Sequence, residues 1–215
     1  MNTRSQPTAS IVEKAAQYVS QLLQDRLAGA YTFHNLEHTR EVVAEAERIG
    51  RACGLSDTEM CILLTAAWFH DIGYIEAYEN HEVVGAQIAE EFLLAEECPP
   101  EFVECVASCI LATQMPQQPR NTIEQVLCDA DVANLGSDSF FEMSTKLRTE
   151  LAAIKGEVFS DEEWRDICYT FCKFHRFHTE YSRRVLGIKQ QENLLMLERE
   201  HIVPTQRTTI TYLPS

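Results

Sequence analysis

The sequence predicts an all-α protein, a single helical bundle organised around one buried helix. Apolar residues recur at helical spacing along most of the 215-residue chain. Ser-x-x-Glu patterns, which are typical of helix starts, occur at several predicted starts, and no pair of strand-like segments is convincing. The stretch 61–71, CILLTAAWFHD, is apolar on nearly every side, so we expect it to be a central helix that ends in His70 and Asp71.

The other helices follow from their start and stop signals. Asn35 is a typical N-cap and Gly54 a typical stop, so one helix lies between them and carries His38 in its first turn. Pro99 and Pro100 separate two later helices. In chain order, the predicted helices are residues 10–27, 35–53, 56–71, 80–98, 101–113, 122–131, 138–154, 160–174 and 180–200.

Some helix starts carry a more specific prediction, a Ser or Thr N-cap paired with a Glu or Gln three residues later. The pairs are Ser10 with Glu13, Ser56 with Glu59, Thr122 with Gln125, and Ser160 with Glu163. Gly73 is expected to end the central helix just past Asp71. We expect one domain over residues 1–204, and a tail or partner-contact strand at residues 205–215.

Acidic residues dominate the charge of the chain. Lys and Arg total 18 against 33 Asp and Glu, a net charge of −15, which excludes a general nucleic-acid binder but not a small phosphorylated ligand. No signal-peptide core or membrane-length apolar run is present, so we expect no membrane partner and a cytoplasmic location. The 8 cysteines lie mostly in apolar helical patterns without a CxxC motif, which predicts reduced core thiols.

His70 and Asp71 form the first candidate site. A carboxylate at a helix C-terminus faces the negative end of the helix dipole, and a buried charge is costly unless it is paired or bound to metal. A bound cation resolves both problems if other segments supply further ligands. The available side chains are His38 in FHNLEH, His81 in NHEVVGA, and Asp131 in CDADVANLG.

This order, His, then His-Asp, then Asp, with an apolar helix before the pair and a Gly soon after the last Asp, resembles the HD-domain superfamily of metal-dependent phosphohydrolases. The resemblance covers the chain from about Tyr31 to Gly136 and implies an HD-type helical bundle. The segments ATQMPQQP, DADVANLG, FHRFHT and KQQENL are similar to a bacterial subfamily of predicted HD phosphohydrolases.

The resemblance implies a metal site. Carried over residue by residue, the family pattern gives as ligands His38, His70, Asp71 and Asp131. Two imidazole nitrogens and two carboxylate oxygens suit one divalent ion, and the residue types do not choose among Mn, Fe, Ni, Zn and Mg. Asp129, two residues from the last ligand, is expected to point to another face of its helix. A second metal is less favoured, because the place of its second histidine holds Ala112-Thr113.

The activity that the resemblance implies is hydrolysis of a phosphate ester by a metal-activated water, assisted by a general acid or base. Related phosphohydrolases often carry a Glu four residues after the His of the pair, and this chain has Tyr74 there. The candidate catalytic residues are therefore Asp71, Glu76 and His81. Asp129 is a further substitute, and His81 is also a candidate outer partner of the metal ligands or substrate contact.

Phosphate requires positive or hydrogen-bonding groups, and the chain concentrates its cations in FCKFHRFHTEYSRRVLGIK. His175 and Arg176 of that segment are candidate substrate-binding residues, because the planar Arg fork suits phosphate. Gln114, in the ATQMP loop, and His34 are further candidates. The alternative reading of the cationic segment is a solvated helix end, and that of His34 is a histidine with ordinary hydrogen bonds near a helix start.

The leading prediction is a metal-dependent hydrolase of a phosphomonoester or phosphodiester, with a nucleotide or nucleotide-like substrate that only the resemblance implies. A non-catalytic sensor that binds a nucleotide through its metal site is the alternative, and Tyr74 favours it. An HD-type di-iron oxygenase is a further alternative, which the Ala112-Thr113 gap disfavours. A homodimer is the oligomeric state that we expect.

Overall fold

The computed structural model describes residues 8–201, and these residues contain helices and no strand. The α-helices are α1 (Thr8–Arg26), α2 (Leu36–Ala52), α3 (Asp57–Phe69), α4 (His81–Ala95), α5 (Pro100–Ala112), α6 (Thr122–Asp131), α7 (Phe140–Ile154), α8 (Asp161–Phe174) and α9 (Glu180–His201). Two short 3₁₀ helices, η1 (Ile72–Ile75) and η2 (Ala133–Gly136), follow α3 and α6. The predicted all-α class is confirmed, while the predicted tail at residues 205–215 lies outside the described residues.

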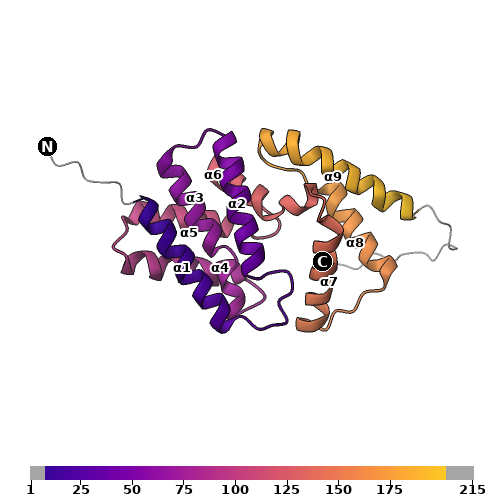
Figure 1. The fold of residues 1–215 in the computed structure, drawn as a ribbon, viewed down its shortest axis with the longest axis horizontal. Helices are drawn as coiled ribbons and strands as arrows, with labels where there is room; N and C mark the ends of the chain where they lie inside the picture. Colours follow the sequence, from indigo (N-terminus) through magenta and orange to yellow (C-terminus); the bar gives the residue numbers. More distant parts are fainter. Residues whose placement is uncertain (1–7, 202–215) are drawn as a thin grey trace.

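The helix α3 is the centre of the bundle, as its apolar sequence predicted. It contacts α1, α2, α5 and α6, which surround it in Figure 1. Leu63, Ala66 and Phe69 are fully buried, whereas Leu64 on the same helix is only half-buried. Because its environment is apolar on most sides, α3 holds its C-terminal residues in a fixed position inside the molecule.

This difference in burial predicts unequal effects of two neighbouring substitutions. Leu63→Ala should lower the free energy of unfolding by about 3–5 kcal/mol, because it leaves a cavity among fully buried side chains. Leu64→Ala removes the same atoms from a half-buried site and should cost about 1–2 kcal/mol. Urea unfolding followed by circular dichroism measures both values. Equal losses would contradict the assignment of α3 as an asymmetrically buried central helix.

Three of the predicted N-cap residues are confirmed by the structure. Asn35 caps α2 by accepting hydrogen bonds from the Glu37 and His38 backbone N–H groups. Ser56 and Ser160 form the predicted capping boxes of α3 and α8. Two predicted caps are wrong. α1 already begins at Thr8, so Ser10 lies inside it, and the side chain that caps α6 belongs to Asn121, which precedes Thr122.

The central helix ends earlier than predicted. α3 stops at Phe69, His70 is its C-cap, and the chain continues into η1 instead of stopping at Gly73. Gly73 serves a different purpose, because a Cβ atom there would lie 1.9 Å from the carbonyl oxygen of His81. The absence of a side chain therefore allows η1 to pack directly on the start of α4, which brings His81 toward the end of α3.

The helices α7, α8 and α9 form a second group beside the α1–α6 bundle (Figure 1). α9 packs on η2 and α8, and the Asn193 side chain of α9 donates hydrogen bonds to the carbonyls of Leu135 and Ser137. Gln190 donates to the carbonyls of Cys172 and His175, which ties α9 to the end of α8. The long α9 therefore fixes α8 relative to the bundle.

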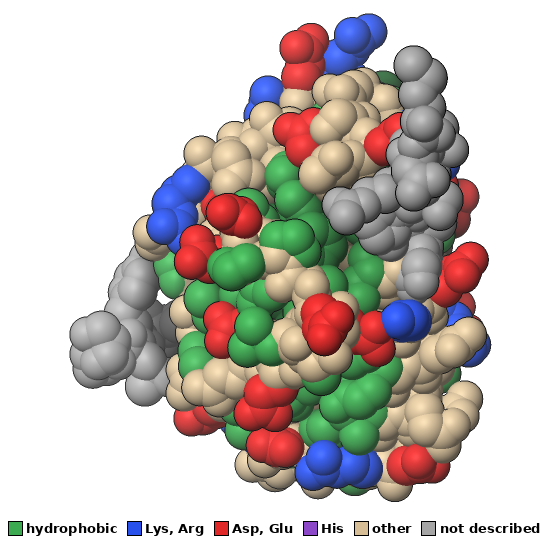
Figure 2. All heavy atoms as spheres, turned by 90° about the vertical axis from the view of Figure 1, so that its left-hand side faces the viewer, with side chains coloured by type: hydrophobic (Ala, Val, Ile, Leu, Met, Phe, Trp, Pro, Cys, Tyr) green, Lys and Arg blue, Asp and Glu red, His purple; other side chains and the backbone are tan. Residues whose placement is uncertain are grey.

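The distribution of charge on the surface and the absence of disulfides among the described residues agree with what the composition predicts. On the face drawn in Figure 2, the end of the molecule opposite α7–α9, acidic side chains border exposed hydrophobic ones and basic side chains are scattered. All 8 cysteines are free thiols, as predicted. Among residues 8–201, no helix combines the length and the apolar character that a membrane crossing requires.

Candidate metal centre

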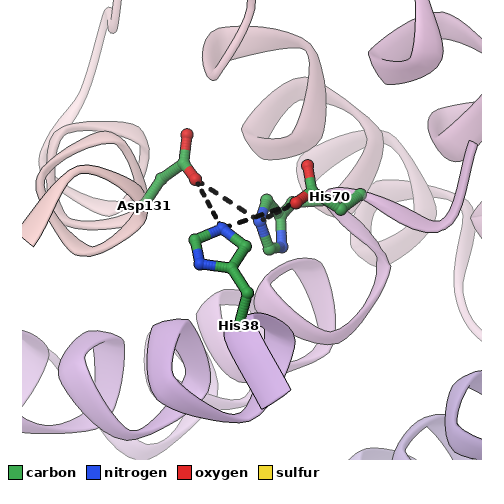
Figure 3. A group of neighbouring side chains, drawn as sticks. His38, His70 and Asp131 are labelled. Atoms are coloured by element: carbon green, nitrogen blue, oxygen red, sulfur yellow. Dashed lines mark ion pairs between the residues drawn. The ribbon is translucent and has the colours of Figure 1, made fainter. Parts of the chain in front are cut away.

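Three elements of the bundle bring four polar side chains to one point. His38 lies in the first turn of α2, His70 caps α3, and Asp131 ends α6. Asp71 follows His70 directly. Figure 3 shows that His38, His70 and Asp131 point toward one another from these separate segments. The structure thus brings together the four residues that the sequence singled out as ligands.

The distances within this cluster are short. Nε2 of His38 lies 3.5 Å from Oδ2 of Asp71 and 3.4 Å from Oδ1 of Asp131. Nε2 of His70 lies 3.1 Å and 3.4 Å from the same two oxygens. One ligand atom from each residue can be chosen so that all lie within 4.8 Å of one another. Among the described residues, this is the single group of His, Cys, Asp and Glu with such an arrangement.

Hydrogen bonding outside the cluster sets the orientation of His70. Its Nδ1 lies 2.8 Å from the carbonyl oxygen of Ala67, one turn earlier on α3. Because a carbonyl only accepts, Nδ1 carries a proton, and Nε2 is the ring nitrogen that faces the cluster. Asn35 fixes His38 in a similar way from the backbone, since its side chain accepts from the His38 N–H and begins α2 at that position.

The inner atoms of the cluster lack hydrogen-bond partners. Nε2 of His38, Nε2 of His70 and Oδ2 of Asp71 are buried without one among the described residues. Buried polar groups are normally satisfied, and a group left without a partner is costly. A cation at the centre would satisfy all three atoms at once, and the mixed nitrogen and oxygen donors suit a borderline or hard divalent ion. The residues present therefore fit a divalent metal.

The electrostatics of the protein groups support the same reading. Burial by itself lowers the pKa of His70, but the carboxylates of Asp71 and Asp131 outweigh burial and raise that pKa well above its ordinary value. Burial raises the pKa of Asp71, but His70 and His81 outweigh it and hold that pKa well below the usual range. Burial also opposes ionisation of Asp131, yet His38 and His70 lower its pKa. Positive charge is thus strongly favoured between the two carboxylates.

The raised pKa of His70 predicts that metal affinity depends on pH. A proton on His70 must leave before its Nε2 can bind a cation, so affinity should fall as the pH is lowered. Below the raised pKa of His70 the expected loss is about tenfold per pH unit for each proton released, so the affinity is to be measured from about pH 8 to pH 6. Calorimetric titration with Mn²⁺ in buffers of different ionisation enthalpy counts the protons released. An affinity that is unchanged over this range would contradict the assignment.

His81 lies beside the cluster. It faces Oδ1 of Asp71, whereas His38 and His70 face Oδ2 of the same carboxylate. Its Nε2 is 3.5 Å from Oδ1 of Asp71, and its Nδ1 is 3.2 Å from the carbonyl oxygen of Tyr78. Burial alone lowers the pKa of His81, but Asp71 outweighs it and the pKa is raised. His81 is therefore placed as an outer partner of a ligand, which is one of the positions expected for it.

Tyr74, which stands where related proteins often carry an acid, fills the space between two histidines. Its ring is stacked on His81 at 3.8 Å between centroids and on His34 at 4.4 Å. Burial raises the pKa of the phenol, so Tyr74 stays neutral. The aromatic residue thus holds two imidazoles on either side of it, in place of supplying a carboxylate.

His34 is fixed by a residue that the sequence did not single out. Glu150 of α7 is fully buried and accepts hydrogen bonds from the backbone N–H groups of Phe33, at 2.8 Å, and His34, at 2.9 Å. Its other oxygen pairs with Nδ1 of His34. The neighbouring Thr32 hydroxyl also binds α7, by donating a hydrogen bond to the Lys146 carbonyl at 2.7 Å. In the sequence, Glu150 resembles any solvated helix charge, so no signal marked it.

Asp129, which precedes Asp131 by two positions in the sequence, has a structural role. Its carboxylate is fully buried and accepts from the backbone N–H groups of His178, at 2.6 Å, and Thr179, at 2.9 Å. The Thr179 hydroxyl donates to it as well, at 2.7 Å. Asp129 therefore fastens the α8–α9 connection to α6, and Asp131 alone of the two points into the cluster.

Four other predicted residues lie apart from the cluster. Glu76 is exposed and faces Arg26 at 3.4 Å, because η1 turns its side chain outward. Gln114 is exposed at the end of α5, while its neighbours Thr113 and Met115 line the cavity described below. These positions contradict the placement of Glu76 and Gln114 beside the reacting groups.

The His175 and Arg176 pair was expected to face the site. The His175 ring packs among Phe171, Phe177 and His178, and burial with the neighbouring His178 lowers its pKa to about 4. Arg176 is exposed and donates to the carbonyls of Lys173 and His175. Neither side chain is among the described residues that line the cavity, since the end of α8 directs them elsewhere.

A cavity of about 510 Å³ opens beside the cluster, between the bundle and the α7–α8 pair. Asp71 and Asp131 line it together with His34, Tyr74 and His81. The remaining lining is largely apolar and comes from α7, α8 and the segments around them. The four-residue cluster therefore faces a space large enough for a small organic molecule.

Comparison with known proteins agrees with this geometry. The family model of the HD domain matches residues 35–134, the segment that contains all four cluster residues. A search of curated proteins found no match to the sequence.

Solved structures share the fold. A predicted HD superfamily hydrolase from an uncultured Thermotogales bacterium has 17% identity and a TM-score of 0.61, over 88% of this chain and 90% of its own. A protein from Lactobacillus plantarum has 14% identity and a TM-score of 0.66, over 94% and 97%. YpgQ from Bacillus subtilis, solved in complex with ADP, has 15% identity and a TM-score of 0.66, over 91% and 96%. At these identities the likeness is one of fold.

Proposed function

We propose that this chain, which is an HD-domain protein with the domain at residues 35–134, is a metal-dependent hydrolase of phosphate esters. The observation that carries the proposal is the cluster of His38, His70, Asp71 and Asp131. Its inner atoms are buried without hydrogen-bond partners among the described residues, and two of its members line a cavity. A site that only stabilised the fold would not need to open onto such a space.

His38, His70, Asp71 and Asp131 would hold a single divalent ion. Such an ion supplies a Lewis acid that polarises a phosphoryl oxygen and lowers the pKa of water. The protein supplies the rest. The buried position of the cluster excludes bulk water, which strengthens every electrostatic interaction at that point.

His34 and His81 are the proposed groups for substrate contact and proton transfer. Both line the cavity, and both are stacked on Tyr74, which limits their rotation. Glu150 holds Nδ1 of His34, so the other ring nitrogen is left for the substrate. His81 lies between Asp71 and the cavity, where it could hold a proton for the leaving oxygen.

A nucleotide-like molecule is the proposed starting class of substrate. The support is the ADP complex of YpgQ, which shares the fold, and the aromatic character of the cavity, whose lining includes Tyr78 and Trp164. A mono- or diester of this kind would place its phosphoryl group at the cluster and its organic part against the apolar wall.

The test is phosphate release by the full chain loaded with Mn²⁺, using 4-nitrophenyl phosphate, its bis ester and nucleoside monophosphates. Turnover is expected with at least one of these compounds. Asp71→Asn should lower kcat/KM by at least about a thousandfold, because it removes one ligand charge and the partner of His81. Asp57→Asn, at the exposed first residue of the same helix, is the matched control and should retain activity.

The alternative of a non-catalytic sensor makes a different prediction. It expects a nucleotide to bind tightly to the metal-loaded unmodified chain, with no phosphate released over hours. Tight binding without turnover across all these esters would therefore replace the hydrolase proposal with the sensor.

A further inference from the structure

The wall of the cavity opposite the metal cluster is built from one face of each of two helices. On α7 the contributing residues follow one helical stripe, namely Met143, Leu147 and Leu151. On α8 they do the same, namely Trp164, Ile167, Cys168 and Phe171. These side chains are apolar. Ser144, the polar residue that α7 adds to the lining, accepts a hydrogen bond from Nε1 of Trp164 at 2.8 Å and lies 3.0 Å from Sγ of Cys168, so this wall offers the cavity no cationic group.

Two of these apolar residues remain accessible. Ile167 is 41% exposed and Phe171 is 40% exposed, although both line the cavity. Large apolar side chains on a concave surface gain free energy when a ligand covers them. The wall therefore fits an apolar partner of small-molecule size, because the cavity is about 510 Å³.

The described residues that line the cavity include no Lys and no Arg. The cations near it are already paired. Lys155 lies over the Tyr78 ring and pairs with Glu79 and Glu157. Arg148 donates to Asp161 and to the Phe159 carbonyl. Glu82 and Glu157, which do line the cavity, add negative charge.

This charge distribution limits the number of phosphates that can bind. One phosphoryl group has a place at the cluster, because a divalent ion held by His38, His70, Asp71 and Asp131 would attract its oxygens, although the Asp71 and Asp131 carboxylates already balance the two charges of such an ion. A second or third phosphate would have to lie against the apolar wall or near Glu82 and Glu157, with no Lys or Arg in the described lining. The histidines of the lining, His34 and His81, already face the carboxylates of Glu150 and Asp71. Burying an unpaired charge in this way is costly.

We infer that the site takes phosphomonoesters with a single phosphoryl group and an apolar or aromatic body, which lies between α7 and α8, and that it discriminates against nucleoside polyphosphates. This inference rests on the proposed function for the identity of the reacting group. The inference narrows the proposed nucleotide-like substrates to nucleoside monophosphates. It also adds other phosphomonoesters that have an aromatic body.

The test is a binding measurement that does not require turnover. Phosphonates keep the charged group but contain a P–C bond that is not hydrolysed. The affinities of 1-naphthylphosphonate, methylphosphonate and ADP for the Mn²⁺-loaded full chain are measured by calorimetry. The naphthyl compound is expected to bind at least about tenfold more tightly than the other two, because its rings cover apolar surface. Equal binding of the two phosphonates, tighter binding of ADP, or no binding of the naphthyl compound would overturn the inference.

Substitution of one wall residue tests the location. Ile167→Lys places a cation in the stripe at an exposed position, so folding should survive. It should reduce the preference for naphthyl over methyl by about tenfold and increase the affinity for ADP. Ile188→Lys, on α9 and 66% exposed, is outside the described cavity lining and is the matched control. If both variants change the preference equally, or if neither does, the assigned wall is wrong.

Hydrolysis distinguishes this inference from the proposed function. If 1-naphthylphosphonate binds as expected but 1-naphthyl phosphate releases no phosphate, the hydrolase proposal fails while the ligand class stands. If phosphate esters are hydrolysed with no preference for an apolar body and the phosphonates bind equally, the hydrolase proposal stands and this inference fails.

Discussion

Asp131→Ala is expected to abolish metal binding while the helices remain. Loss of an outer partner of a metal ligand typically costs 10–100-fold in affinity, so loss of a ligand should exceed about 100-fold. Asp131 lies at the end of α6, and its carboxylate oxygen is 3.4 Å from Nε2 of both His38 and His70. Among the described residues, Asp71 is the only other carboxylate of the cluster and is itself one of the four proposed ligands, so no further carboxylate can replace Asp131.

Elemental analysis of the purified variant measures the metal, and circular dichroism measures the helices. The unmodified chain should hold near one equivalent of a divalent metal, and Asp131→Ala should hold almost none with an unchanged helical signal. Full metal content in the variant would show that Asp131 is not a ligand. Two equivalents in the unmodified chain would show that His81 belongs to a second site.

Asp129→Ala, two residues away, is expected to have the opposite effect. It removes the acceptor of two backbone N–H groups and one hydroxyl, which come from His178 and Thr179. Because Asp129 is fully buried, these donors would be left unsatisfied, and the free energy of unfolding should fall by about 3–5 kcal/mol. The metal content of the folded fraction should stay near that of the unmodified chain.

Urea unfolding and elemental analysis of both variants complete this comparison. The two residues carry the same functional group on the same helix, so general effects of charge removal are matched. A variant Asp129→Ala with normal stability and no metal would mean that the two assignments must be exchanged. Similar changes in both properties for both variants would show that the two carboxylates act as one unit.

Much of the molecule was determined by local sequence. The apolar run of 61–69 favours burial on most sides of the helix, so the central position of α3 followed from it. Asn35, Ser56 and Ser160 capped helices as predicted because capping depends on a few neighbouring residues. The four cluster residues followed from their order along the chain, with a buried His-Asp pair that needed compensation.

Tertiary structure alone decided the surroundings of the cluster. Glu150 reaches His34 across 116 positions of sequence, and its burial depends on where α7 packs. Tyr74 became a spacer between His34 and His81 only because the missing Cβ of Gly73 lets η1 pack on α4.

Three of the four predicted substrate residues, Gln114, His175 and Arg176, lie outside the described cavity lining, whereas His34 is part of it. The sequence showed that cations gather near Arg176, but charge composition does not say which way a helix end turns, and Arg176 donates to its own backbone. The α7 and α8 stripes looked like ordinary core-facing positions, because helical spacing specifies a face and not what that face meets. The sequence by itself thus determined the central helix and the four residues of the cluster, whereas the packing of α7–α9 decided that an apolar wall lies opposite them.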